Sequence, residues 1–206
     1  MSISALQKNW RQKYDCVPQQ LEKVKKVHSV ATAFNTNIDA VLKISGKRLS
    51  ELIETVNLSE EEFSNSRTLL ETPQDVVHGI AKCFSRGIAE EWICDDKAVY
   101  EWMQQNLGYN RLQMGGQGGI VANALAVLGV QNVFVHTNSH PKLQAQQFLP
   151  LDNLFGIDEN DKACRACDID RAAETPLVHW IIEFDIGDSF MAWGKEFICP
   201  KSNRFI

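Results

Sequence analysis

Residues 114–137, MGGQGGIVANALAVLGVQNVFVHT, decide the fold class of this chain. Four glycines surround Gln117, and the apolar run that follows is closed by Gly129, which predicts a helix over residues 120–128. Residues 132–137 are apolar and β-branched, which is typical of a buried strand. A glycine turn, a helix and a strand in this order make a β/α unit, so the sequence predicts an α/β fold.

Further elements are expected on both sides of this stretch. Residues 27–34 and 178–184 have the composition of buried strands. A polar amphipathic helix over residues 4–26, interrupted near Pro18, is expected to pack on the outside of a core. Helices are also expected over residues 49–56, after the capping sequence of residues 59–62, and over residues 76–86, after the start signal Thr72-Pro73-Gln74-Asp75.

Composition indicates an ordinary globular protein. The 206 residues are 44% hydrophobic and 23% charged, which argues against disorder and allows one large domain, or one domain and part of another. A net charge of −5 gives no broad basic surface, so we expect no nucleic-acid partner. The opening residues lack an apolar signal region and no stretch is long enough to span a bilayer, so we expect no membrane partner and a cytoplasmic location.

The six cysteines suit neither a disulfide scaffold nor a two-pair zinc site. Cys164 and Cys167 form one CxxC, but neighbouring aspartates would raise the pKa of a thiol rather than lower it. We therefore expect reduced thiols rather than a redox or zinc centre.

Three patterns are candidates for binding. Asn37 and Asp39 lie two apart, so an extended segment would point both side chains to one face, where a carboxylate and an amide suit adjacent sugar hydroxyls; an Asx-type turn is the alternative. Gly116 and Gln117 open a helix whose N–H groups would face a ligand, although a tight turn without a ligand needs similar glycines. His179 lies in a strand-like run, where a hydrogen-bonded core histidine is the alternative to a functional one.

Four segments in the same order resemble a known family. FNTNID (34–39), MGGQGGIVAN (114–123), VHWIIEF (178–184) and PKSNRFI (200–206) are similar to the signatures of the archaeal-type ADP-dependent glucokinases and phosphofructokinases. The resemblance covers nearly the whole chain, and four ordered matches are specific where each alone is weak.

The resemblance implies a ribokinase-like fold, in which a Rossmann-like α/β large domain carries the nucleotide site and a smaller lid with β-strands closes over the sugar. Large-domain segments are expected within residues 1–40 and 111–160, and lid segments within residues 41–110 and 160–200. The implied reaction transfers the β-phosphoryl group of ADP to glucose or fructose 6-phosphate, releases AMP and uses Mg²⁺.

Sugar-binding roles are implied for the matching positions Asn37, Asp39, Gly116, Gln117 and His179. Either Glu90, which we favour, or Glu91 resembles the glutamate that favours glucose in the glucokinase branch; two solvated charges are the alternative. Relatives have a basic residue in the turn after the EF dipeptide, where Asp185-Ile186-Gly187 stands here, so one phosphate contact is expected to be missing. Arg204 remains a candidate for holding a sugar phosphate.

The family's catalytic aspartate lies in a GxGD motif, and these 206 residues contain no such motif. No catalytic residue and no metal ligand is therefore assigned here, and the magnesium ligands are expected in a C-terminal half. We expect a chain truncated at its C-terminus that carries the sugar-binding half of the kinase and is inactive alone, with a separately encoded C-terminal half as a candidate partner. The alternative is a non-catalytic remnant or sugar-binding protein.

Overall fold

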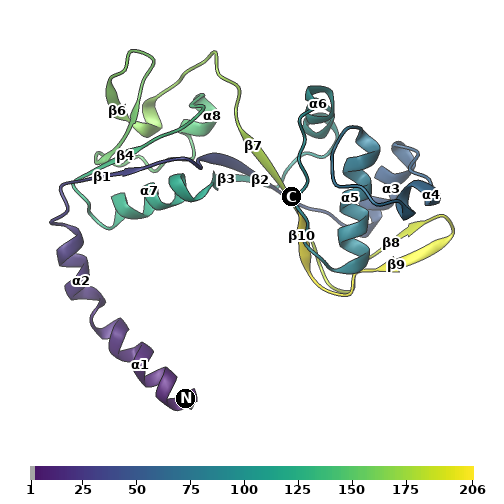
Figure 1. Cartoon of the computed structure of the whole chain (residues 1–206), viewed down its shortest axis with the longest axis horizontal. Helices are drawn as coiled ribbons and strands as arrows, with labels where there is room; N and C mark the ends of the chain where they lie inside the picture. The colour runs from purple at the N-terminus through teal and green to yellow at the C-terminus, as the bar shows by residue number, and fades with distance from the viewer. Residues whose placement is uncertain (1–2) are drawn as a thin grey trace. The chain divides into compact units, whose positions relative to one another are not determined.

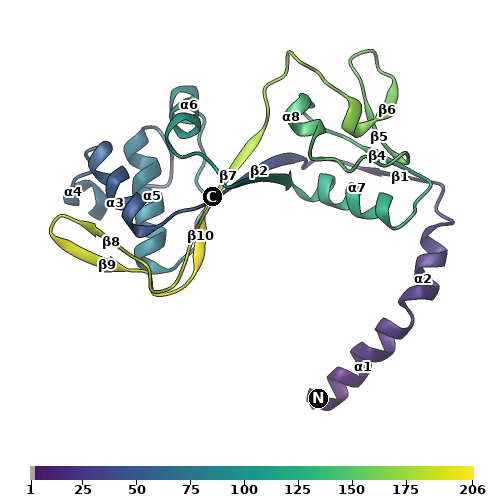
Figure 2. The same ribbon diagram turned by 180° about the vertical axis from the view of Figure 1, so that it is seen from behind.

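The computed structural model describes residues 3–206, which form two separately packed units. The first unit comprises residues 3–38 and Met114–Leu177, and the second comprises Asp39–Gln113 and Val178–Ile206. The expected α/β fold is confirmed: each unit combines helices with a sheet of four strands (Figures 1 and 2).

The sheet of the first unit has the strand order β1-β4-β5-β6. The strands β1, β4 and β5 are parallel, and β6 is antiparallel to β5. Figures 1 and 2 both show α7 along one side of this sheet and α8 on the other. The elements of this unit are α1 (Ile3–Asp15), α2 (Val17–Val24), β1 (Ser29–Thr32), α7 (Gln117–Val127), β4 (Asn132–Val135), α8 (Lys142–Ala145), β5 (Leu154–Ile157), β6 (Ala163–Arg165) and the 3₁₀ helix η1 (Ala166–Asp168).

The second unit is built on the strand order β10-β7-β2-β3, with a separate hairpin of β8 and β9. One core contains residues from the sheet, the helices and the hairpin, among them Ile182, Phe84 and Phe190. The elements are β2 (Asn37–Lys43), which begins in the first unit, α3 (Gly46–Thr55), α4 (Glu60–Ser64), α5 (Pro73–Arg86), α6 (Lys97–Asn106), β3 (Arg111–Gly115), β7 (Val178–Phe184), β8 (Ser189–Ala192), β9 (Lys195–Ile198) and β10 (Asn203–Phe205).

Local sequence signals account for the bounds of α5. The side chain of Thr72 accepts a hydrogen bond from the amide of Asp75, and the side chain of Asp75 accepts one from the amide of Thr72, which together cap the helix. Pro73 occupies the first turn. Gly87 ends the helix with a φ of 61°, which glycine adopts without strain. The predicted start signal at residues 72–75 is confirmed.

One expectation about the first unit is wrong. The strand predicted over residues 27–34 is shorter, and only Thr32 of β1 is buried, because β1 lies at the edge of its sheet. The strand β6 pairs with β5, and Ala166 belongs to the core of the first unit. The identity of the two units as large domain and lid stays a prediction.

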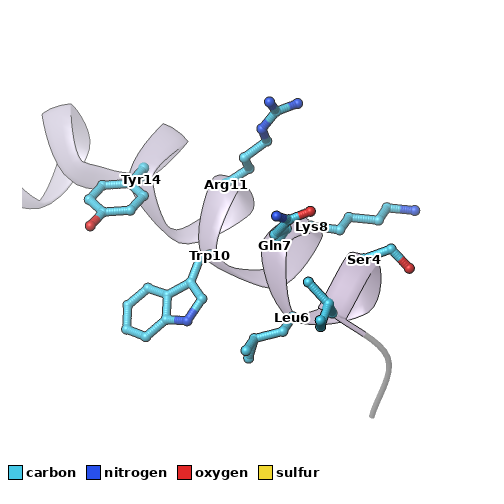
Figure 3. Close-up of a pocket in the computed structure, with 8 residues that line it drawn as sticks. Ser4, Leu6, Gln7, Lys8, Trp10, Arg11 and Tyr14 are labelled. Atoms are coloured by element: carbon cyan, nitrogen blue, oxygen red, sulfur yellow. The ribbon is translucent and has the colours of Figure 1, made fainter.

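The amphipathic N-terminal helix is formed as α1 and α2, which meet at Cys16. Its expected packing on a core is not observed for α1, none of whose residues is buried. Figure 3 shows Leu6 and Trp10 on one side of α1 and Arg11 on the other. No helix in residues 3–206 is both long enough and apolar enough to cross a membrane.

His78 on α5 is buried without hydrogen bonds. It is only 1% exposed, and neither ring nitrogen has a hydrogen-bond partner among residues 3–206. The rings of Phe63 and Trp92 pack edge-on against it, with centroids at 5.8 and 5.6 Å. Burial, together with the charges of Arg67 and Lys82, lowers the pKa of His78, so the imidazole is neutral in the folded chain.

This burial predicts that acid destabilises the second unit. Below about pH 6.5 the unfolded chain binds a proton at residue 78 that the folded chain does not bind, so stability falls as the pH falls. The loss attributable to His78 is expected to be at most about 1 kcal/mol between pH 7 and pH 5.5, because the unfolded chain takes up at most one proton at this residue. Urea unfolding of His78→Leu should show a correspondingly weaker pH dependence, whereas the exposed His28→Gln should match the wild type. An unchanged pH dependence in His78→Leu would contradict the prediction.

Candidate functional site

The glycine turn before α7 packs directly on the segment that leads into β2. Gly116 has a φ of 72°, and a Cβ at this position would lie 2.4 Å from the Asn35 carbonyl oxygen and 2.6 Å from Asn37 Oδ1. The amide of Gly118 donates a hydrogen bond of 2.7 Å to the Asn35 carbonyl. Close packing alone therefore accounts for the glycines, in agreement with the alternative of a tight turn that binds no ligand. The same packing brings Asn37, Gly116 and Gln117 together.

Asn37 and Asp39 both belong to β2 and not to an Asx-type turn. Residues two apart in a strand point to the same face, as the sequence analysis assumed for an extended segment. Asn37 is buried and Asp39 is half-buried. The boundary between the two units falls between Ile38 and Asp39, so Asn37 is described with the first unit and Asp39 with the second.

Backbone hydrogen bonds place Asp39 beside His179. The amide of Ile38 donates to the backbone carbonyl of Leu177, and the amide of Ile44 donates to that of Glu183, each at 2.9 Å. In both bonds the acceptor follows the donor by the same number of residues along the chain, which shows that β2 and β7 are parallel. In this register Asp39 lies next to His179, and both side chains are on the face turned away from the core, which we call the outer face of the second sheet.

The alternative of a buried core histidine is wrong for His179. Its neighbours Trp180 and Ile182 are buried on the core face, whereas His179 is exposed. No hydrogen bond to its ring is present within the described part of the chain, residues 3–206. The imidazole and the Asp39 carboxyl group therefore offer polar atoms on one accessible surface.

A row of charges crosses three strands of the outer face. Arg204 on β10 is paired in register with Glu183 on β7, and the parallel register puts Lys43 on β2 at the other side of Glu183. The ammonium group of Lys43 forms an ion pair with Asp185, and this hydrogen bond raises the pKa of Lys43. The guanidinium of Arg204 is exposed and makes no ion pair within residues 3–206.

Lys43 was missed by sequence reasoning. It brings a positive charge to the turn Asp185-Ile186-Gly187, where the sequence had shown no basic residue. The available signal was the two-residue period of β2, which puts residue 43 on the same face as Asp39.

The structure separates Glu90 from Glu91. Glu90 bridges to Phe205, whose side chain is buried, so the Glu90 side chain points to the core face. There its Oε2 accepts hydrogen bonds of 2.8 Å from Lys82 Nζ and Trp92 Nε1. Desolvation alone would raise the pKa of the Glu90 carboxyl group, but these two hydrogen bonds outweigh it and the pKa is lowered. Glu91 is exposed, and as the next strand-like residue it points to the opposite face.

The thiols of the CxxC are free. Burial and Asp158 raise the pKa of Cys164, and burial and Asp168 raise the pKa of Cys167. Across residues 3–206 no three His, Cys, Asp or Glu side chains gather as they would to hold a metal ion.

The predicted site residues form two groups. The group in the first unit comprises Asn37, Gly116 and Gln117. The group in the second unit lies on the outer face of the sheet and comprises Asp39, Glu91, His179 and Arg204, whereas Glu90 lies on the core face.

These residues lie within a region that matches a known sequence family. The sequence model described as the ADP-specific Phosphofructokinase/Glucokinase conserved region matches residues 28–206. The chain belongs to this family. It is 30% identical to the ADP-specific phosphofructokinase of Thermococcus kodakarensis over 92% of this chain and 42% of the relative. It is 33% identical to the ADP-dependent glucose/glucosamine kinase of Pyrococcus furiosus over 96% of this chain and 43% of the relative.

The fold agrees with that of a solved family structure. An ADP-dependent kinase in complex with fructose-6-phosphate and ADPβS is similar with a TM-score of 0.72 and 28% identity, over 100% of this chain and 39% of that one. The chain thus spans about two fifths of the length of the family members it matches.

The packing at Gly116 predicts a large cost for a methyl group there. Gly116→Ala combines an unfavourable positive φ with a clash against the Asn35 carbonyl, so we expect a loss of at least about 2 kcal/mol in the free energy of unfolding. Gly187→Ala is the matched control, because Gly187 has a φ of 81° but nothing within 4 Å of the added Cβ. Urea unfolding measures both variants, and equal losses would show that the contact with residues 35–37 is unimportant.

The separation of the two glutamates predicts different roles. Glu90→Gln leaves the ammonium of Lys82, which is only 14% exposed, without its charged partner, so we expect a loss of about 1–3 kcal/mol. Glu91→Gln is expected to change stability by less than about 0.5 kcal/mol, because Glu91 is exposed. Thermal or urea unfolding distinguishes them, and a larger effect of Glu91→Gln would reverse the assignment of the two faces.

Proposed function

We propose that this chain carries the acceptor-sugar-binding part of an ADP-dependent sugar kinase. The observation that supports this most is the parallel register of β2 and β7, which places Asp39 beside His179 on an accessible face, at positions that match the family's motifs. In the proposed reaction a sugar hydroxyl oxygen forms a bond to the β-phosphorus of ADP while the bond to the oxygen bridging the two phosphates breaks. AMP leaves, and the hydroxyl proton is released.

The polar side chains suit a sugar acceptor. The carboxylate of Asp39 accepts hydrogen bonds from hydroxyl groups, and the imidazole of His179 both donates and accepts in its neutral form. We propose sugar-binding roles also for Asn37, Gly116 and Gln117, as the family resemblance implies. We further propose that the first unit is part of the large domain and that the second unit is the lid. The names of the relatives, which include a phosphofructokinase and a glucose/glucosamine kinase, agree with this substrate class.

The remaining catalytic parts are not assigned to these residues. ADP is the proposed phosphoryl donor, and Mg²⁺ is the metal that the family resemblance implies. The described residues gather no set of three ligands for such an ion. A carboxylate that positions or deprotonates the acceptor is expected in a GxGD motif, which these 206 residues do not contain.

Lys43 and Arg204 bear on the choice between glucose and fructose 6-phosphate. A sugar phosphate carries about −1.5 to −2 charges near neutral pH, and both cations attract it. Glu183 lies between the two cations, Asp185 binds Lys43, and Glu91 faces the same side. These carboxylates repel a phosphate at this surface. We propose that neutral glucose is bound through Asp39 and His179, and that fructose 6-phosphate binds only when its phosphate displaces Asp185 from Lys43.

This proposal predicts different effects of two pairs of substitutions. Asp39→Ala with His179→Ala should weaken both sugars at least tenfold, because both use the hydroxyl contacts. Lys43→Ala with Arg204→Ala should weaken fructose 6-phosphate about fivefold to tenfold and leave glucose unchanged. Calorimetry or saturation-transfer NMR with the 206-residue chain measures these affinities.

Glu101→Ala on α6 serves as the control, since Glu101 is an exposed carboxylate whose ion partner, Lys97, is itself on the surface. Wild-type affinity for both sugars in the Asp39→Ala, His179→Ala double variant would refute the proposed site. Equal weakening of both sugars by loss of Lys43 and Arg204 would refute the phosphate contact alone.

A further inference from the structure

Phe34 is held in a backbone conformation that aromatic residues rarely adopt. Its φ is 77°, in the left-handed region, where the Cβ of a bulky residue crowds the backbone. A residue of this type stays in the left-handed region only where the surrounding structure imposes it, and such strained residues cluster at ligand sites. The strain at Phe34 therefore requires either a structural explanation or a functional one.

The other non-glycine residues with a positive φ within residues 3–206 have a structural explanation. Asn57 and Asp161 belong to residue types that tolerate the left-handed region. Trp193 is bulky, but its ring packs on that of Phe63 with centroids 5.0 Å apart. Its indole N–H also donates a hydrogen bond of 2.9 Å to the backbone carbonyl of Leu58. Contacts of the side chain thus offset the strain at Trp193.

The side chain of Phe34 has no comparable contacts. Phe34 is 91% exposed, more than any other large apolar residue in the described part of the chain. It belongs to neither hydrophobic core of residues 3–206 and does not pack against either one. Phenylalanine is normally among the most buried residue types. A strained backbone that holds an aromatic ring in water has no explanation in the packing of the chain, which favours a functional one.

The position of Phe34 connects it with the proposed sugar contacts of the first unit. It follows the carboxyl end of β1, and the carboxyl ends of parallel strands are where α/β sheets bind ligands. The backbone is packed against α7 on both sides of Phe34. A Cβ at Gly118 would lie 3.1 Å from the carbonyl oxygen of Ala33 and 2.8 Å from that of Asn35. The exposed ring is therefore anchored beside the glycine turn that carries Gly116.

An aromatic ring that has no polar atom binds the least polar face of a ligand. In β-glucopyranose every ring substituent is equatorial, so both faces of the ring carry only C–H groups. In the furanose ring of fructose 6-phosphate, hydroxyl groups project from both faces. A phenyl ring therefore covers the pyranose without leaving hydroxyl groups unpaired, whereas it would cover hydroxyl groups of the furanose.

We infer that Phe34 is a specificity-determining residue, which stacks on the ring of a pyranose acceptor and favours glucose over fructose 6-phosphate. The inference rests on the proposed function and adds to it an apolar contact from the first unit. The polar contacts of Asp39 and His179 hold the edges of the sugar, and Phe34 recognises the shape of its ring.

The first test measures sugar affinity by calorimetry with the 206-residue chain. Phe34→Ala should weaken glucose about fivefold and fructose 6-phosphate less than about twofold, because only the pyranose loses a stacking partner. Phe34→Tyr keeps an aromatic ring and should bind both sugars as the wild type does. Val127→Ala is the control, since Val127 is another exposed apolar residue of the first unit.

A second test separates a binding role from a structural one. Glycine adopts a φ of 77° without strain, so Phe34→Gly should unfold at a urea concentration no lower than that of the wild type. The same variant should lose glucose affinity as Phe34→Ala does. Trp193→Gly is the matched contrast, because it removes a ring with packing contacts, and its urea midpoint should fall.

Four results would overturn the inference. If Phe34→Ala keeps wild-type glucose affinity while the Asp39→Ala, His179→Ala double variant loses it, Phe34 is not a contact and the proposed function stands. Equal weakening of both sugars by Phe34→Ala would refute selection of the pyranose. A lower urea midpoint of Phe34→Gly would make the ring a structural element. Absence of glucose binding to the wild-type chain would refute the proposed function, and the inference with it.

Discussion

The close approach of residues 35–37 to the glycine turn before α7 is the constraint on which the candidate site depends. A side chain at position 116 would overlap the Asn35 carbonyl, and the amide of Gly118 bonds to that same oxygen. This contact fixes where β2 begins relative to α7. Once β2 begins at Asn37, the alternation of the strand determines which side chains share a face, and Asp39 and Lys43 follow together onto the outer face.

The sequence predicted the elements whose signals are local. The cap at Thr72, Pro73 and Asp75 marks the start of α5, and Gly129 marks the end of α7, because each signal acts within one helical turn. The edge position of β1 was not predictable, since an apolar strand of four residues does not show how many neighbours it has. The pairing of Lys43 with Asp185 was also missed, because it depends on the register of two strands that are far apart in the sequence. The choice between Glu90 and Glu91 likewise required the bridge from Glu90 to Phe205.

The row of charges on the outer face keeps two cations beside carboxylates that a ligand can replace. Arg204 and Lys43 lie on either side of Glu183, and Asp185 binds Lys43 from the turn. Exposed ion pairs contribute little to stability, so a ligand phosphate can replace the Asp185 carboxylate at little cost. A hydrogen bond between charged groups is stronger when water is excluded, so the contribution of these cations to ligand choice depends on how far a bound ligand excludes water from the outer face.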